Sequence, residues 1–135
     1  MCKDFECAYE RLRNQPMPSL GYNILAGVKG DEGVVIARDR FGPAHEEHLS
    51  SANGTWFVLQ TNNDQWDSGC YNRCAAATER IESVGQASIN HTTLRSSVMY
   101  DFPTENYDTL YNTDFTPSTS YMQTTMLDYD GTGET

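Results

Sequence analysis

The sequence has few basic residues. Of its 135 residues only 9 are Lys or Arg, against 19 Asp or Glu, which gives a formal net charge of -10. A surface that binds nucleic acid needs Lys and Arg to neutralise phosphates, so the composition argues against nucleic acid as a partner. The same deficit gives the chain no electrostatic attraction to an anionic membrane surface.

The sequence also lacks a long hydrophobic run. No segment approaches the roughly 20 apolar residues of a transmembrane helix, so we expect no transmembrane segment. The first residues, MCKDFECAYERLRNQ, have no apolar core and are not expected to act as a signal peptide. The length is that of a single domain, which we expect to span residues 1–135.

Cysteine is scarce, and its pairing is open. Four cysteines allow three complete pairings, and the sequence does not choose among Cys2, Cys7, Cys70 and Cys74. Two glycosylation sequons begin at Asn53 and Asn90, and they matter only if the chain passes through the secretory pathway. The sequons and the missing signal peptide therefore point to different compartments.

Hydrophobic periodicity predicts the first elements. Residues 3–13 form an amphipathic helix, because Phe5, Ala8, Tyr9 and Leu12 share one face. A hairpin follows, with strands at 22–28 and 34–38. The first of these strands is apolar on both faces, and we expect it to be covered on both sides.

The rest of the chain alternates further strands, helices and loops. Strands are predicted at 45–49 and 55–61, on either side of a tight turn signalled by Asn53-Gly54. Later come helices at 75–84 and 92–100, a long loop at 101–117 and a last strand at 121–127. The fold class is α+β, with an antiparallel sheet covered by helices.

Several motifs invite a chemical role but have a simpler explanation. His45 and His48 do not match the HExxH zinc motif, because in a strand their rings point to opposite faces. Cys70 and Cys74 have zinc-like spacing without a second ligand pair. The sequence from Asp128 to Gly131 is only a fragment of a calcium loop. We therefore expect no metal site.

The segment that ends the predicted strand at 55–61 is polar where a core would be apolar. It reads Asn62-Asn63-Asp64-Gln65-Trp66, and Arg73 follows. An amide at a strand end can donate to a substrate carbonyl or a developing oxyanion, and a nearby arginine can hold a carboxylate. An Asx-type turn sealed by Trp66 explains the same residues. The residues alone leave both interpretations open.

Two segments resemble a known family. Residues 33–40 (GVVIARDR) are similar to the "GVVITRNR" segment of the acid ceramidase and N-acylethanolamine-hydrolysing acid amidase family. Residues 56–66 (WFVLQTNNDQW) are similar to its strand "W-F/Y-x-V-Q/E-T-N-Y-D-x-W". Weaker likenesses to its "NFEEA", "YYIVAG" and "VYTT" segments fall, in the same order, at residues 4–8, 22–27 and 121–126.

The resemblance implies a four-layer αββα sandwich of the N-terminal-nucleophile hydrolases. In that family self-cleavage exposes a cysteine that attacks an amide carbonyl, and its own α-amine acts as the base. By resemblance, Asn62 matches the asparagine of the oxyanion hole, and Arg73 matches the arginine of a "DDRRT" segment that organises the site. No metal or organic cofactor is implied.

The sequence departs from the family in ways that bear on activity. Asn63 stands where the family has Tyr, and the segment between Trp66 and Arg73 is shorter. The family's nucleophile lies upstream of the helix at residue 3, and Cys2 is at the wrong place to replace it. We therefore expect a single partial domain, without the nucleophile strand and the final strand, that is inactive alone.

The sequence thus predicts the C-terminal segment of a lysosomal or secreted acid amidase. Its substrate would be an N-acyl lipid, either ceramide or an N-acylethanolamine, and its partner the missing N-terminal part or α-subunit of the same enzyme. The alternative is a truncated, non-catalytic paralogue that binds a lipid or a protein partner. A third hypothesis makes Cys2 an active nucleophile after removal of Met1.

Overall fold

The structure is a computed structural model that describes residues 1–127, and the calcium-loop fragment at 128–131 lies outside them. The chain divides into two units, Met1–Gly69 and Cys70–Thr135, and each is described by itself. Within the described part, no helix is long and apolar enough to cross a membrane.

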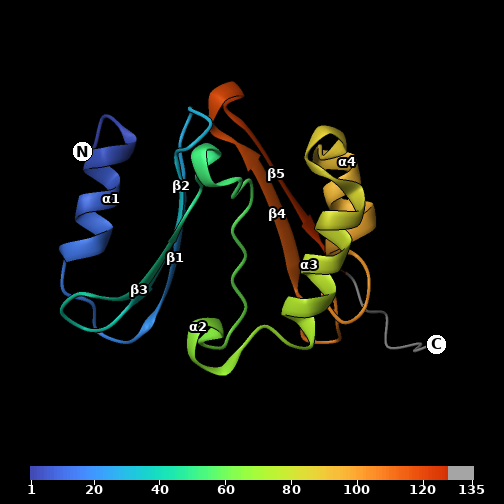
Figure 1. Cartoon of the computed structure of the whole chain (residues 1–135), viewed down its shortest axis with the longest axis horizontal. Helices are drawn as coiled ribbons and strands as arrows, with labels where there is room; N and C mark the ends of the chain where they lie inside the picture. The colour runs from blue at the N-terminus through green and yellow to red at the C-terminus, as the bar shows by residue number, and fades with distance from the viewer. Residues whose placement is uncertain (128–135) are drawn as a thin grey trace. The chain divides into compact units, whose positions relative to one another are not determined.

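Helix α1 (Phe5–Asn14) forms where the sequence predicts it. Asp4 caps its start, because the carboxylate accepts a hydrogen bond from the backbone N–H of Cys7 at 2.9 Å. The predicted apolar face is half-buried and the opposite face is exposed. This face packs the helix alongside the first sheet (Figure 1).

The first sheet is antiparallel, in the order β1 (Gly21–Ala26), β2 (Gly33–Arg38), β3 (Pro43–His48). The central strand β2 is buried along its whole length and forms the core of the first unit. The prediction that β1 is covered on both sides is wrong, since Ile24 is 60% exposed. Ile24 and Ala26 point to the same face of β1 and are exposed, while Asn23 and Leu25 on the other face are half-buried, and alternation in the sequence does not reveal which faces other elements cover.

The turn after β3 is as predicted, but the strand after it is not. A 3-10 turn η1 (Ser51–Asn53) leads into Gly54, whose φ of 73° is the left-handed conformation that favours glycine. Ser50 and Thr55 then form an isolated bridge. Residues 56–61 form no strand within residues 1–127. The prediction of a strand at 55–61 is wrong, because alternation makes a strand only where a partner takes up its backbone hydrogen bonds.

A short helix α2 (Gln65–Ser68) ends the first unit, and helix α3 (Arg73–Val84) begins the second. The chain continues through η2 (Gln86–Ser88), α4 (His91–Leu94) and a π-helical turn η3 (Arg95–Met99). Asn90 opens α4 with a capping box, accepting from the backbone N–H groups of Thr92 and Thr93. Among the described residues of this unit, the buried side chains are Cys74, Ala77, Ile81 and Val98.

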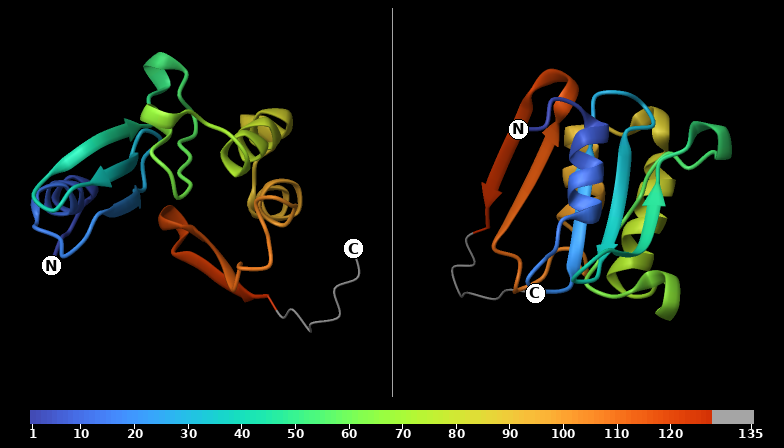
Figure 2. Two further views of the ribbon diagram at one scale, coloured as in Figure 1. Left: turned by 90° about the horizontal axis from the view of Figure 1, so that it is seen from below. Right: turned by 90° about the vertical axis from the view of Figure 1, so that its left-hand side faces the viewer.

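The loop predicted at 101–117 is only partly a loop. Strand β4 (Tyr111–Thr116) lies inside it, and the turn η4 (Pro117–Thr119) joins it to β5 (Tyr121–Met126). The prediction is wrong here because the inward side chains of β4 are the polar Asn112, Asp114 and Thr116, whereas Tyr111 and Phe115 point outward. A strand of this kind lacks the alternation of buried apolar and exposed polar residues from which strands are predicted. Helix α4 and η3 lie along one side of this hairpin (Figure 2).

The structure chooses among the open cysteine pairings. Disulfides join Cys2 to Cys7 and Cys70 to Cys74, so both bridges are local. Antiparallel strands accompanied by helices confirm the predicted α+β class.

Candidate functional site

The polar segment after residue 59 is a turn held by its own side chains. The Gln60 amide donates to the carbonyl oxygens of Thr61 at 2.7 Å and Asn63 at 2.9 Å. The Thr61 hydroxyl donates to the side-chain oxygen of Asn63 at 2.6 Å. Asn62 lies within this turn and is exposed. The side-chain bonds hold the backbone on both sides of Asn62, so its amide is carried by a braced turn.

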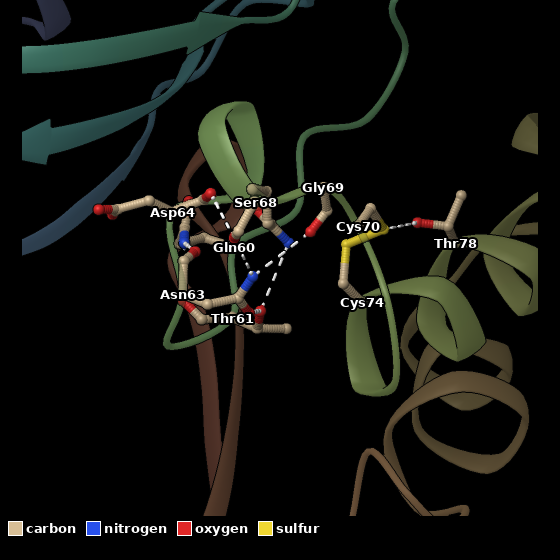
Figure 3. The surroundings of a disulfide bond; sticks show 10 residues. Gln60, Thr61, Asn63, Asp64, Ser68, Gly69, Cys70, Cys74 and Thr78 are labelled. Atoms are coloured by element: carbon tan, nitrogen blue, oxygen red, sulfur yellow. Dashed lines mark hydrogen bonds between the residues drawn. A yellow bond between two sulfur atoms is a disulfide. The ribbon is translucent and has the colours of Figure 1, made fainter.

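Further contacts tie the turn to α2. The Ser68 hydroxyl donates to the carbonyl of Asp64 at 2.8 Å. The Asn63 amide reaches the Ser68 hydroxyl at 3.4 Å and the Gly69 carbonyl at 3.5 Å (Figure 3). Asn63, which replaces the family's Tyr, thus has a local structural role in this chain.

Trp66 anchors the same segment to the first sheet. Its ring stacks on His45 of β3, with centroids 4.6 Å apart and planes at 15°, and meets the edge of Tyr22 at 6.4 Å. The Tyr22 hydroxyl donates to a carboxylate oxygen of Asp64 at 2.6 Å. That hydrogen bond, then burial, then the negative charge of Asp64 raise the pKa of Tyr22 above its usual range. Tyr22 therefore acts as a neutral donor here.

A cavity of about 210 Å³ adjoins this anchor. Its walls are Leu20, Gly21, Tyr22, Ala37, Arg38, Asp39, Ala44, Asp64 and Trp66. The site is small and mixed in polarity, and two of its wall residues, Tyr22 and Asp64, are hydrogen-bonded to each other. Asn62 is not among the residues that line it.

Arg73 occupies the first position of α3 and is half-buried. The residue before it, Asn72, has a φ of 56°, a left-handed conformation that Asn tolerates better than most residues. The Cys70–Cys74 disulfide spans Arg73 and ties the chain before α3 to its first turn (Figure 3). Asn62 belongs to the first unit and Arg73 to the second. Their joint action stays a prediction.

The second unit contains a cluster of charged residues that was not predicted from the sequence. His91 Nδ1 lies 2.6 Å from a carboxylate oxygen of Asp114, and its Nε2 lies 2.9 Å from the Thr116 hydroxyl. Arg95 donates to the other oxygen of Asp114 through Nε at 2.7 Å and through a second nitrogen. Asp114 and Thr116 fall in the segment expected to be a loop, which is why the cluster was missed.

The electrostatics of this cluster centre on Asp114. Burial pushes the pKa of its carboxyl upward, but hydrogen bonds and charge from Arg95 and His91 together outweigh burial and leave the pKa lowered. The same hydrogen bond to Asp114 raises the pKa of Arg95. The carboxylate is thus held ionised between two basic side chains. A cavity of about 330 Å³ opens beside them.

The two sequon asparagines and the two histidines of β3 have different surroundings. Asn53 is exposed in the η1 turn, whereas Asn90 uses its side chain as the cap of α4. His45 contacts Trp66, while the ring of His48 contacts Tyr9 at 5.6 Å, so the two imidazoles have different neighbours. Within residues 1–127, no group of three or more His, Cys, Asp or Glu side chains is placed to hold a metal ion.

Comparison with known proteins places these observations in context. The chain is 38% identical over 113 residues to an N-acylethanolamine-hydrolyzing acid amidase of Rattus norvegicus, covering 82% of this chain and 31% of that protein. It is 35% identical over 92 residues to an acid ceramidase of Balaenoptera acutorostrata scammoni, covering 67% of this chain and 23% of that protein. No protein-family model matches the chain.

A solved structure of a related protein has a similar fold. The Caenorhabditis elegans N-acylethanolamine-hydrolyzing acid amidase ortholog superposes with a TM-score of 0.77 at 27% identity. The match covers 91% of this chain and 54% of that one. The chain spans about a third of the length of the rodent amidases that it matches, or 31%.

Proposed function

Because this chain is a homologue of the N-acylethanolamine-hydrolyzing acid amidases and acid ceramidases, we propose that it is the C-terminal segment of such an enzyme. The reaction is hydrolysis of an N-acyl lipid amide, ceramide or N-acylethanolamine, to a fatty acid and an amine. The observation that carries the proposal is the match in sequence and fold over most of the chain. The chain matches 31% of the rat amidase and 54% of the solved structure, which supports a segment of an enzyme rather than a whole enzyme.

In this proposal the chain supplies supporting groups, and the N-terminal part or α-subunit of the same enzyme supplies the nucleophile. The thiolate of a cysteine there attacks the amide carbonyl carbon, and the carbonyl oxygen becomes an oxyanion. The Asn62 amide donates a hydrogen bond to that oxyanion, and the braced turn spares it reorganisation during the reaction. Arg73 orients the site through its guanidinium, at the disulfide-tied start of α3.

We propose a lysosomal or secreted location, with glycans at Asn53 and Asn90. Two observations support an oxidising compartment of this kind. All four cysteines are paired in disulfides, which persist in secreted proteins and rarely in the cytosol. Both sequons also start at residues in turns or at a helix cap, where the backbone is near the surface.

A chimera tests the proposal. Residues 1–127 replace the matching segment of the rat amidase, and hydrolysis of an N-acylethanolamine and of ceramide is measured at acidic pH. We expect activity, and a loss of kcat of roughly a hundredfold to a thousandfold in Asn62→Ala, which is the usual cost of removing an oxyanion donor. Asn63→Ala is the comparison variant, because it loosens the brace of the turn but keeps the Asn62 donor, so its kcat should fall less than that of Asn62→Ala.

Two results would refute the proposal. One is a folded chimera that hydrolyses neither substrate while the rat parent does. The other is an active chimera in which Asn62→Ala and Asn63→Ala lower kcat equally, because Asn62 would then have no role beyond the turn. Arg73→Lys tests the second residue, since a lysine keeps the charge and loses the planar fork.

A non-catalytic paralogue that binds a lipid or a protein is the second candidate. One observation favours it. The outward face of the β4–β5 hairpin carries Tyr111, Phe115, Met122 and Met126, all at least half exposed. These residues lie opposite one another in the register, as Tyr111 with Met126 and Phe115 with Met122. An apolar face of this kind is typical of an interaction surface.

A further inference from the structure

Strand β4 has its polarity reversed relative to an ordinary strand beside helices. Asn112, Asp114 and Thr116 are half-buried, while the alternate residues Tyr111, Thr113 and Phe115 are exposed. Burial of polar groups is costly unless they are paired, so a core-facing strand normally does the opposite. The inward face of β4 is therefore built to line a polar cavity rather than to pack a core.

That cavity has the size of a small-molecule site. Its volume of about 330 Å³ falls at the lower end of the range for ligand pockets. The helical side supplies an apolar wall of Ile89, Leu94 and Met99. The strand side supplies the polar row of β4, so one ligand would meet both kinds of surface.

Most hydrogen-bonding groups of the polar wall are satisfied by one another. Asp114 is bound by Arg95 and His91, and Thr116 is bound by His91. Two donors have capacity left. The side-chain nitrogen of Asn112 is buried without a hydrogen-bond partner in residues 1–127. Arg95 engages Asp114 and Tyr121 through Nε and Nη2, which leaves Nη1 unused among the described residues.

The two donors are held at neighbouring positions along β4. Asn112 and Asp114 are alternate residues on one face of β4, so they stand about 7 Å apart along the strand. Arg95 is fastened to Asp114, which brings its guanidinium to the neighbouring position. A group with two acceptor oxygens can accept from both, and a carboxylate forms the strongest such bonds with arginine.

We propose that this cavity binds an aliphatic carboxylate of the fatty-acid class, with its oxygens on Asn112 Nδ2 and Arg95 Nη1 and its chain along Ile89, Leu94 and Met99. The site is argued from its own geometry and involves neither Asn62 nor Arg73. A fatty acid is also what the proposed hydrolysis releases, and in that respect alone the choice of class rests on the proposed function.

Three probes test the site on the full chain by calorimetry and by amide chemical shifts. Octanoate has both head and chain, octanol has the chain with a neutral head, and acetate has the head alone. We expect octanoate to bind at least tenfold more tightly than either of the others. Its shifts should centre on β4, α4 and η3. Equal affinity for octanoate and octanol, or octanoate shifts confined to other elements, would overturn the proposal.

A substitution at Asn112 separates binding from structure. Asn112→Leu keeps the approximate volume and removes the donor, so octanoate affinity should fall about tenfold while octanol binding does not weaken. The thermal midpoint should not fall, because an unpaired buried donor has been removed. Tyr111→Thr, on the exposed side of the same strand, is the control and should bind like the parent. Unchanged octanoate affinity in Asn112→Leu would show that the carboxylate does not bind at this site.

These outcomes are independent of the amidase assay. The probes bind or fail to bind in the chain as it stands, without the nucleophile. Failure of the chimera with normal octanoate binding would refute only the catalytic role, and an active chimera with no octanoate binding would refute only the carboxylate site.

Discussion

Arg38 is the buried basic residue of the first unit, and its replacement should be costly. Only 2% of the residue is exposed. Its guanidinium donates to the carbonyl oxygens of Leu12, of Gln15 at 2.9 Å and of Gly42 at 3.1 Å. Two of these carbonyls are at the C-terminal end of α1, where helical carbonyls lack internal partners. Arg38 thus joins α1, the central strand β2 and the turn that follows it.

The expected cost follows from these contacts. A hydrogen bond with a charged partner contributes about 1.5–3 kcal/mol, and a buried acceptor left without a donor costs about 1–3 kcal/mol. Arg38→Met removes three such bonds but also removes the desolvated charge, which offsets part of the loss. We therefore expect the free energy of unfolding to fall by about 3–5 kcal/mol. That is a large share of the roughly 5–15 kcal/mol that stabilises an ordinary domain.

Tryptophan fluorescence during urea unfolding measures this change. The two tryptophans of the chain, Trp56 and Trp66, both lie in the first unit, so the signal reports on that unit. With a typical urea dependence of about 1–3 kcal/mol per molar, the midpoint should fall by at least about 1 M. Arg38→Lys should lie between the parent and Arg38→Met, because one ammonium cannot reproduce the planar fork.

Arg40→Met is the matched control. Arg40 has the same side chain two positions later in the sequence, and it is exposed. Its replacement should change the stability by no more than about 0.5 kcal/mol. If Arg38→Met and Arg40→Met unfold at the same urea concentration, the three carbonyl contacts do not stabilise the first unit and the reasoning is wrong.

Other predictions concern titration and modification. Burial, then the charge and hydrogen bond of Glu46, raise the pKa of Tyr9, so its phenol should ionise above the ordinary pH in an ultraviolet titration, and Glu46→Gln should bring it down. This raised pKa contributes stability below about pH 10 that is lost as pH rises through the folded value. The lowered pKa of Asp114 has the opposite sign: its stabilisation is present above the unfolded value and is lost as pH falls through the folded one. Amide protection in β4 and β5 should therefore decline in strong acid, and Asp114→Asn should show weaker protection at neutral pH with no such decline. In a secretory host, mass spectrometry should find Asn53 more fully glycosylated than Asn90, whose amide also donates to the carbonyl of Ser88 at 3.2 Å. Equal occupancy would show that capping α4 does not protect Asn90.

Features set by neighbouring residues were predictable from the sequence. The periodicity of α1 and the Asn53-Gly54 turn each depend on residues a few positions apart. Their backbone preferences and periodicity are visible in the chain itself. The polar turn that carries Asn62 was visible for the same reason, and the family resemblance supplied the roles assigned to Asn62 and Arg73.

Features set by distant partners were not predictable. Residues 56–61 alternate like a strand, but a strand also requires a neighbour to pair with, and alternation does not supply one. Strand β4 was not predicted because its inward side chains are polar. His91 and Arg95, which precede Asp114 by about twenty residues, pair with Asp114 and so offset the cost of burying it. The local sequence determines the helices and turns, whereas the tertiary structure determines which strands pair and which polar groups are buried. The physical reason is that a backbone or polar group can be buried only where the fold brings it a hydrogen-bond partner.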